Sequence, residues 1–191
     1  MATVIGITGG IGSGKSVVST ILKILKYPVY DSDSQAKQLM ITSPVIKSEL
    51  KTLIGDDVYV GDIINKPLLS SYIFSSEENR ERVNSIVHPQ VRIHFAEWRQ
   101  KQTSDIVFIE SAILFESGLN EDVDEVWCVC ADKNIRVERV MMRNAISKQE
   151  VMARINSQMS DDEVIAKSDC IIDNSGKVSL LKQIKNNLNI Y

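Results

Sequence analysis

The sequence is poor in the residues that build metal centres and disulfide frameworks. It has three cysteines and two histidines in 191 residues. The cysteines, Cys128, Cys130 and Cys170, all lie in apolar, strand-like stretches, which is typical of buried reduced thiols. The first two would share one strand face, but so few histidines make a zinc site a poor explanation. The pattern therefore indicates a reducing compartment.

An excess of basic charge and a long apolar run are also missing. The formal net charge is −3, with acids and bases spread along the chain, which argues against a nucleic-acid binder but leaves room for a basic pocket. No apolar run approaches the roughly 18 residues of a membrane span. The Gly-rich stretch from Gly9 has no basic segment before it, so we expect no signal peptide. We expect a cytoplasmic protein without a membrane, nucleic acid or obligate protein partner.

Five short β-rich runs alternate with helical patterns. The runs are Val4–Thr8, Val29–Asp31, Ile106–Glu110, Glu125–Ala131 and Cys170–Asp173. They are continuously apolar, as in strands that are covered on both faces of a parallel sheet. Helices are predicted over Lys15–Lys26, Gln35–Met40, Asn134–Arg143 and Val178–Asn189. This alternation predicts an α/β fold with an open, doubly wound, five-stranded parallel sheet that binds ligands beyond the carboxyl ends of its strands.

Two helical insertions interrupt this single predicted domain. The core comprises about 1–33, 102–138 and 168–191, the first insertion about 34–101 and the second about 139–167. Capping boxes that begin helices stand at Ser75, Ser147 and Ser160, and Pro89 restarts the chain into another helix. We interpret the first insertion, with a short strand near Val58–Val60, as a substrate-binding subdomain. The second predicts a short helical lid.

Residues 9–16 match the phosphate-binding pattern G-x-x-x-x-G-K-[ST], directly after a strand and directly before a helix. The glycines let backbone N–H groups turn toward phosphates, and the helix N-terminus adds partial positive charge. Lys15 can reach the β- and γ-phosphates, and the Ser16 hydroxyl can ligate Mg²⁺. A Gly-rich turn with a solvated lysine is the alternative. The residues predicted to bind ATP here are Gly10, Ile11, Gly12, Ser13, Gly14, Lys15, Ser16 and Val17.

Acids at strand ends are candidates for the chemistry. Asp31 and Asp33 end the second strand, and residues two apart in a strand point to the same side. A carboxylate there can orient an acceptor hydroxyl and take its proton, and Asp33 is the better candidate. Capping of the next helix is the alternative for either residue. Glu110 ends the third strand, where it would hold a Mg²⁺-bound water or pair with a nearby helix.

Basic and amide side chains follow the fourth and fifth strands. Arg136, Arg139 and Arg143 lie at spacings of three and four, near one helix face. Such arginines can stabilise charge on a transferred phosphoryl group, and a solvated face is the alternative for any one of them. Asn174 is predicted to contact adenine, or else to form a turn before Gly176.

An ordered set of motifs runs along the whole chain. The set comprises Ile5–Ser16, Asp31-Ser-Asp33 followed by Ala36, His88-Pro89, Leu114-Phe115-Glu116, Arg139 with Arg143, Arg154 with Gln158, and Asp169–Asn174. Together these motifs resemble the dephospho-CoA kinase family. The resemblance implies a fold of the P-loop NTPase type, with a helical substrate domain and a closing lid. It also implies transfer of the γ-phosphoryl group of ATP, with Mg²⁺, to the ribose 3′-hydroxyl of dephospho-CoA, which is the last step of coenzyme A synthesis.

The resemblance assigns roles to individual residues. It implies Asp33 as the base, Lys15 as a phosphate-binding group, and Arg143 or Arg139 as the lid cation. The residues expected at the acceptor are Asp31, Asp33, His88 and Glu116. Two positions depart from the family: Ala112 stands where proline is usual, and Asn144 follows Arg143 where aspartate is frequent. Neither position supplies a group that the reaction needs.

Other nucleotide-binding classes fit the sequence less well. A GTP-dependent switch needs Asp-x-x-Gly after the third strand, but this pattern occurs only at Asp173–Gly176, and Asn-Lys-x-Asp is missing. A mechanical ATPase would need a larger chain. Another small-molecule or nucleoside monophosphate kinase remains open from the residues alone. The arginines that could clamp an acceptor phosphate are Arg80, Arg82, Arg92 and Arg99.

Overall fold

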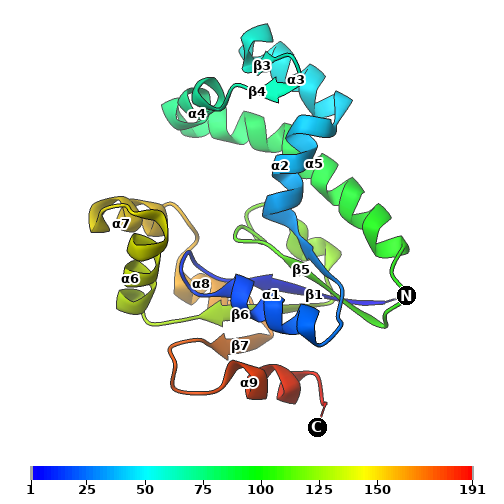
Figure 1. Cartoon of the computed structure of the whole chain (residues 1–191), viewed down its shortest axis with the longest axis vertical. Coiled ribbons are helices and arrows are strands. Elements are labelled where there is room, and N and C mark those ends of the chain that lie inside the picture. The colour runs from blue at the N-terminus through cyan, green and yellow to red at the C-terminus, as the bar shows by residue number, and fades with distance from the viewer. Residues whose placement is uncertain (1, 191) are drawn as a thin grey trace. The chain divides into compact units, whose positions relative to one another are not determined.

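The computed structural model of the chain describes residues 2–190 and divides into two compact units (Figure 1). The first unit comprises Met1–Tyr30 and Gln102–Tyr191, and we call it the sheet unit. The second comprises Asp31–Lys101, and we call it the helical unit. The division of the sheet unit into a core and a lid stays a prediction. Within residues 2–190, no helix is both long and apolar enough for a bilayer span.

A five-stranded parallel sheet with the strand order β2-β5-β1-β6-β7 organises the sheet unit. The strands are β1 (Thr3–Thr8), β2 (Val29–Asp31), β5 (Ile106–Glu110), β6 (Glu125–Cys130) and β7 (Cys170–Asp173). The three inner strands β5, β1 and β6 are almost wholly buried, as continuous apolar runs require. The predicted sheet is therefore confirmed, with bounds that differ by at most one residue.

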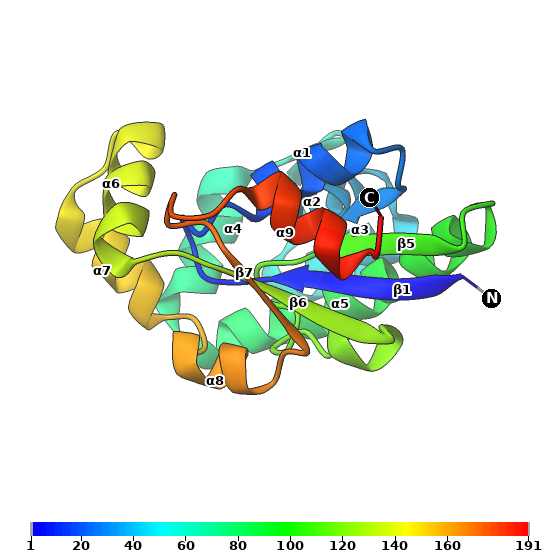
Figure 2. The ribbon, with the colours of Figure 1, turned by 90° about the horizontal axis from the view of Figure 1, so that it is seen from below.

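Helices cover both faces of this sheet, so it is doubly wound as predicted. The helices of the sheet unit are α1 (Lys15–Ile24), η2 (Leu119–Asp122), α6 (Lys133–Asn144), α7 (Lys148–Asn156), α8 (Asp161–Ala166) and α9 (Leu180–Asn187). Figure 2 shows α1 and α9 on one face and α8 on the other. The predicted capping boxes that begin α7 at Ser147 and α8 at Ser160 are both present.

The core of the sheet unit lies mainly between the sheet and helices α1 and α9. Phe108 and Trp127 are fully buried and meet edge to face, with ring centroids 5.4 Å apart. Leu22 of α1 and Ile184 of α9 close the same cluster and are fully buried. The three cysteines are free thiols, and burial raises the pKa of Cys128 to about 12. This core fixes α1, and with it the loop that precedes α1.

The helical unit is built around one long helix. Its elements are α2 (Ser32–Thr42), α3 (Pro44–Ile54), η1 (Asp56–Val58), β3 (Tyr59–Val60), β4 (Ile63–Ile64), α4 (Lys66–Ser75) and α5 (Glu77–Gln100). Helix α5 packs against α2, α3 and α4 and buries Val83, Val87, Val91 and Phe95. This apolar stripe follows the helical period and forms the core of the unit.

Three predicted details of the helical unit are wrong. The cap of α5 is Ser76, which accepts from the N–H of Asn79, and not Ser75. Pro89 lies inside α5 rather than at the start of a new helix. A helix-interior proline costs roughly 3 kcal/mol, and the buried stripe of α5 outweighs that cost. Helix α2 begins at Ser32, three residues before the predicted Gln35.

Candidate active site

The segment Gly9–Ser16, which we call the phosphate loop, joins β1 to α1 as predicted. Gly14 immediately precedes α1, and Lys15 and Ser16 form the first turn of that helix. The Lys15 Nζ donates to the carbonyl of Gly9 at 2.7 Å, so the side chain folds back over the loop. The Ser16 side chain is exposed at the N-terminal end of α1. A helix N-terminus of this kind is suited to bind an anion.

The conformation of the phosphate loop requires glycine where other parts of the unit approach the backbone. Gly14 has a φ of +100°, and a Cβ there would lie 2.0 Å from the side-chain nitrogen of Asn174. Gly12 has a φ of +80°, and a Cβ there would lie 2.6 Å from the carbonyl oxygen of Arg136. No L-residue adopts these angles without strain, and no side chain fits these gaps. The glycines therefore let neighbouring elements hold the loop at close range.

Arg136 is buried against the phosphate loop and does not face solvent. This residue of α6 is only 2% exposed, and its Nε donates to the carbonyl of Ile11 at 2.9 Å. Its Nη1 lies 2.5 and 2.6 Å from the two carboxylate oxygens of Asp161 in α8. The solvated face that the sequence left open is therefore wrong for Arg136. A buried guanidinium needs such partners, because an unpaired buried charge is strongly destabilising.

Arg139 and Asn174 meet at the other side of the loop. The Asn174 side chain donates to the carbonyl of Ser13 at 2.7 Å. Arg139 Nη2 donates to the carbonyl of Asn174 at 2.9 Å, and Nη1 reaches the carbonyl of Gly12 at 3.5 Å. Arg143 lies one turn further along α6, is exposed, and donates to the side chain of Asn144 at 2.9 Å. Arg139 is thus beside the loop, and contact of Asn174 with adenine stays a prediction.

Gln158 is a loop contact for which the residue pattern gave no role. It stands in the connection between α7 and α8, and its Oε1 accepts from the N–H of Ile11 at 2.8 Å. Its Nε2 donates to the carbonyl of Ala112 at 3.3 Å. In the same connection, the N–H of Met159 donates to Glu116 at 3.2 Å. Gln158 binds position 112 through the backbone carbonyl alone, so alanine can replace proline there without loss of this hydrogen bond.

The two aspartates predicted for the chemistry lie at the start of the helical unit. Asp31 is the N-cap of α2, and its carboxylate accepts from the N–H of Ser34 at 3.0 Å and from its hydroxyl at 2.6 Å. Asp33 lies in the first turn of α2 and is exposed. The two residues do not share a strand, so the argument from strand alternation is wrong. The capping that was left open is confirmed for Asp31, and its role at the acceptor stays a prediction.

The residues predicted for Mg²⁺ are Glu110, at the end of β5, and Ser16, in the first turn of the helix that follows the neighbouring strand β1. Glu110 closes β5, where it pairs in register with Ile7 of β1, and Ser16 follows the loop from β1. Residues 2–190 contain no cluster of three or more His, Cys, Asp or Glu side chains that could hold a metal. One hydroxyl and one carboxylate suit Mg²⁺, because this ion keeps several waters and takes further ligands from phosphates. The donor set therefore fits Mg²⁺ bound with a nucleotide.

Helix α5 carries His88, which is predicted to contact the acceptor, and Arg80 and Arg82, which could bind a phosphate of an acceptor. His88 is half-buried in α5, and burial lowers the pKa of its imidazole, so the side chain is mainly neutral at pH 7. Arg80 pairs with Glu77, and Arg82 pairs with Glu78 at 2.6 Å, on the same helix. Exposed pairs of this kind are weak, and they do not prevent either arginine from binding a phosphate.

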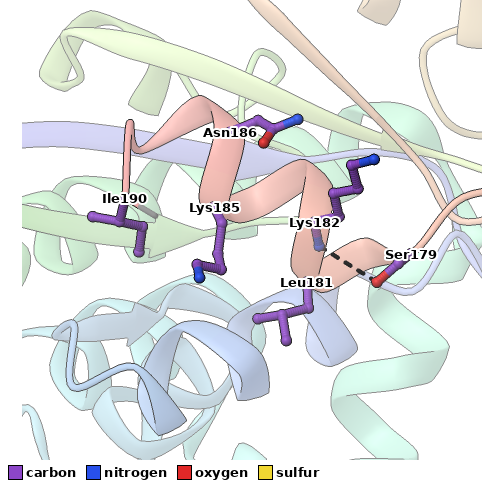
Figure 3. A pocket seen from close by; sticks show the side chains of 6 residues that line it. All are labelled: Ser179, Leu181, Lys182, Lys185, Asn186 and Ile190. Carbon is purple, nitrogen blue, oxygen red and sulfur yellow. Dashed lines mark hydrogen bonds between the residues drawn. The ribbon is translucent and has the colours of Figure 1, made fainter.

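A shallow hollow of about 330 Å³ lies along α9 (Figure 3). Its lining residues are Ser179, Leu181, Lys182, Lys185, Asn186 and Ile190. None of them belongs to the set predicted for nucleotide, metal or acceptor. The residues that line the hollow are therefore different from those that surround the phosphate loop.

Comparisons with known proteins identify the family of the chain. The dephospho-CoA kinase family model matches residues 3–179. A dephospho-CoA kinase of Bacteroides fragilis is 46% identical over 185 residues, covering 96% of this chain and 90% of that one. Another from Porphyromonas gingivalis is 51% identical over 154 residues, covering 81% and 76%. A crystal structure of a Thermus thermophilus protein, 33% identical, superposes with a TM-score of 0.88 over 98% of this chain and 96% of that one.

The family match covers both units, and the Bacteroides fragilis relative aligns over 96% of the chain. It therefore includes the phosphate loop, the two aspartates at the start of α2 and the connection that carries Gln158. The chain belongs to the dephospho-CoA kinase family.

Proposed function

We propose that this chain transfers the γ-phosphoryl group of ATP to the ribose 3′-hydroxyl of dephospho-CoA, giving CoA and ADP. The observation that carries the proposal is a preformed phosphate loop in a chain of this kinase family. Membership of the family makes ATP the phosphoryl donor. A cytoplasmic location stays our prediction, and the free, partly buried thiols support it.

In the proposed reaction, the acceptor oxygen attacks the γ-phosphorus while the bond from that phosphorus to the β–γ bridging oxygen breaks. ADP leaves with the bonding electrons, and the hydroxyl proton passes to the carboxylate of Asp33. The exposed position of Asp33 in the first turn of α2 supports this role, because an acceptor can approach it. Catalysis of this kind depends mostly on positioning and charge stabilisation.

The charge on the phosphates would be balanced by groups around the loop. Lys15 and the loop N–H groups would bind the β- and γ-phosphates. Arg139, which lies against the loop, and the exposed Arg143 on the same helix are the proposed lid cations. Mg²⁺, held by Ser16 and through water by Glu110, would neutralise phosphate charge and orient the γ-phosphoryl group. Closure of the proposed lid over these groups would exclude water and limit ATP hydrolysis.

The acceptor is tested with a coupled ADP-release assay with ATP and Mg²⁺, comparing dephospho-CoA with AMP, CMP and adenosine. We expect acceptor-stimulated turnover with dephospho-CoA alone, and a product with the mass of CoA. Turnover with a nucleoside monophosphate instead would keep the phosphate-loop chemistry but refute the proposed acceptor. Absence of any acceptor-stimulated turnover would refute the proposed reaction.

Replacement of Asp33 by asparagine tests the proposed base. The variant keeps the size of the side chain but removes the proton acceptor, so we expect turnover to fall by about 10² to 10⁴. ATP affinity should stay nearly unchanged, because Asp33 is not part of the phosphate loop. Asp57→Asn, which removes an exposed carboxylate elsewhere in the helical unit, serves as the control. A parallel fall of ATP affinity and turnover in Asp33→Asn would contradict the assignment.

Alanine at Gly14 tests the phosphate loop and has a matched control at Gly176. Both positions have a positive φ, +100° and +89°, but a Cβ meets Asn174 only at Gly14. Both variants should lose roughly 1–2 kcal/mol of stability from backbone strain, and Gly14→Ala should lose more, because its Cβ displaces Asn174. Only Gly14→Ala should also weaken ADP binding, by at least about tenfold, in isothermal titration calorimetry. Equal ADP affinities in the two variants would show that close packing at Gly14 is not needed for binding.

A further inference from the structure

Ile11, in the middle of the phosphate loop, is held from three directions by one part of the sheet unit. Its N–H donates to Gln158 Oε1 at 2.8 Å, and its carbonyl accepts from Arg136 Nε at 2.9 Å. Its side chain packs against a cluster of buried valines from α6 and α7. These two helices lie side by side, beyond the carboxyl ends of β1 and β6 (Figure 1). The backbone and the side chain of one loop residue are therefore fixed together.

The two polar partners of Ile11 are themselves anchored. Gln158 bridges the phosphate loop to Ala112, which follows β5, so its amide joins the loops after two adjacent strands. Arg136 is fixed by its ion pair with Asp161, the first residue of α8. Gln158 and Asp161 stand only three residues apart, in the α7–α8 connection and at the first residue of α8, so one short segment both binds Ile11 directly and anchors Arg136.

We propose that Gln158 is a positioning residue for the phosphate loop. Its amide fixes the peptide group between Gly10 and Ile11, and so sets the direction of the N–H groups that follow in the loop. This inference deepens the proposed function, on which it rests, because it concerns the same nucleotide site. Backbone N–H groups stabilise a phosphate best when they are oriented before it arrives. A loop that must be ordered during binding loses part of its affinity.

A purely structural role for Gln158 makes a different prediction. In that case its loss would only destabilise the connection between α7 and α8, as would any other substitution that weakens these helices. Ser147 offers the matched control, because its hydroxyl caps α7 through two hydrogen bonds with Glu150 and touches no residue of the phosphate loop. Removal of that cap should cost about 1 kcal/mol, comparable to the loss of the Gln158 bonds.

The experiment compares Gln158→Leu and Ser147→Ala with the unaltered chain. ADP affinity in the presence of Mg²⁺ is measured by calorimetry, and thermal unfolding is measured in parallel. We expect both variants to unfold at lower temperature, and Gln158→Leu alone to bind ADP about tenfold more weakly, as the loss of one or two partly buried hydrogen bonds implies. Unchanged ADP affinity in Gln158→Leu, or an equal loss in Ser147→Ala, would overturn the proposal.

Asp161→Asn provides a second variant that acts through the carbonyl side of Ile11. It weakens the partner of Arg136 without touching Gln158, and we expect ADP affinity to fall several-fold. An Asp161→Asn protein that binds ADP as tightly as the unaltered chain would argue against support of the loop from this segment. Because the readout needs no acceptor, it also separates this proposal from the proposed function. A chain that binds ADP but does not phosphorylate dephospho-CoA would contradict the proposed function alone.

Discussion

The backbone of the phosphate loop must keep its N–H groups turned in one direction while its carbonyls find partners elsewhere. Three side chains from distant parts of the chain pair with backbone groups of the loop. Arg136 binds the carbonyl of Ile11, Asn174 binds that of Ser13, and Gln158 binds the N–H of Ile11. Buried backbone groups are almost always paired in this way. The arrangement of α6, α7, α8 and the turn after β7 follows from this requirement.

Charge is concentrated locally in a chain that is acidic as a whole. Lys15, Arg136 and Arg139 all contact carbonyls of the phosphate loop, although the formal net charge is −3. Asp161 neutralises the buried Arg136, so this residue acts on loop geometry more than on phosphate charge. Lys15 and Arg139 remain as cations that contact the phosphate loop. A small polyanion can therefore bind a protein whose overall charge would not attract nucleic acid.

Features that are contiguous in the sequence were predicted well. Continuous apolar runs located all five strands of the sheet, and the spacing of glycines and Lys15 located the phosphate loop. Rules based on neighbouring residues failed where two adjacent residues could cap the same helix, and where packing against distant residues determined the structure. Ser75 has the capping-box spacing to Glu78, but its neighbour Ser76, three residues before Asn79, caps α5. The buried stripe of α5 outweighs the effect of Pro89. Gln158 lies 147 residues after Ile11, so no local pattern could pair them.

The central claim is that the phosphate loop is held in its binding form before nucleotide arrives. Hydrogen–deuterium exchange resolved to single amides tests it in the free protein. The account predicts that the Ile11 N–H exchanges at least about a hundredfold more slowly than an exposed amide, because Gln158 accepts from it. Addition of ADP should then protect the N–H groups of residues 12–15 and change Ile11 little. Rapid exchange at Ile11 that slows only when ADP is added would contradict the claim.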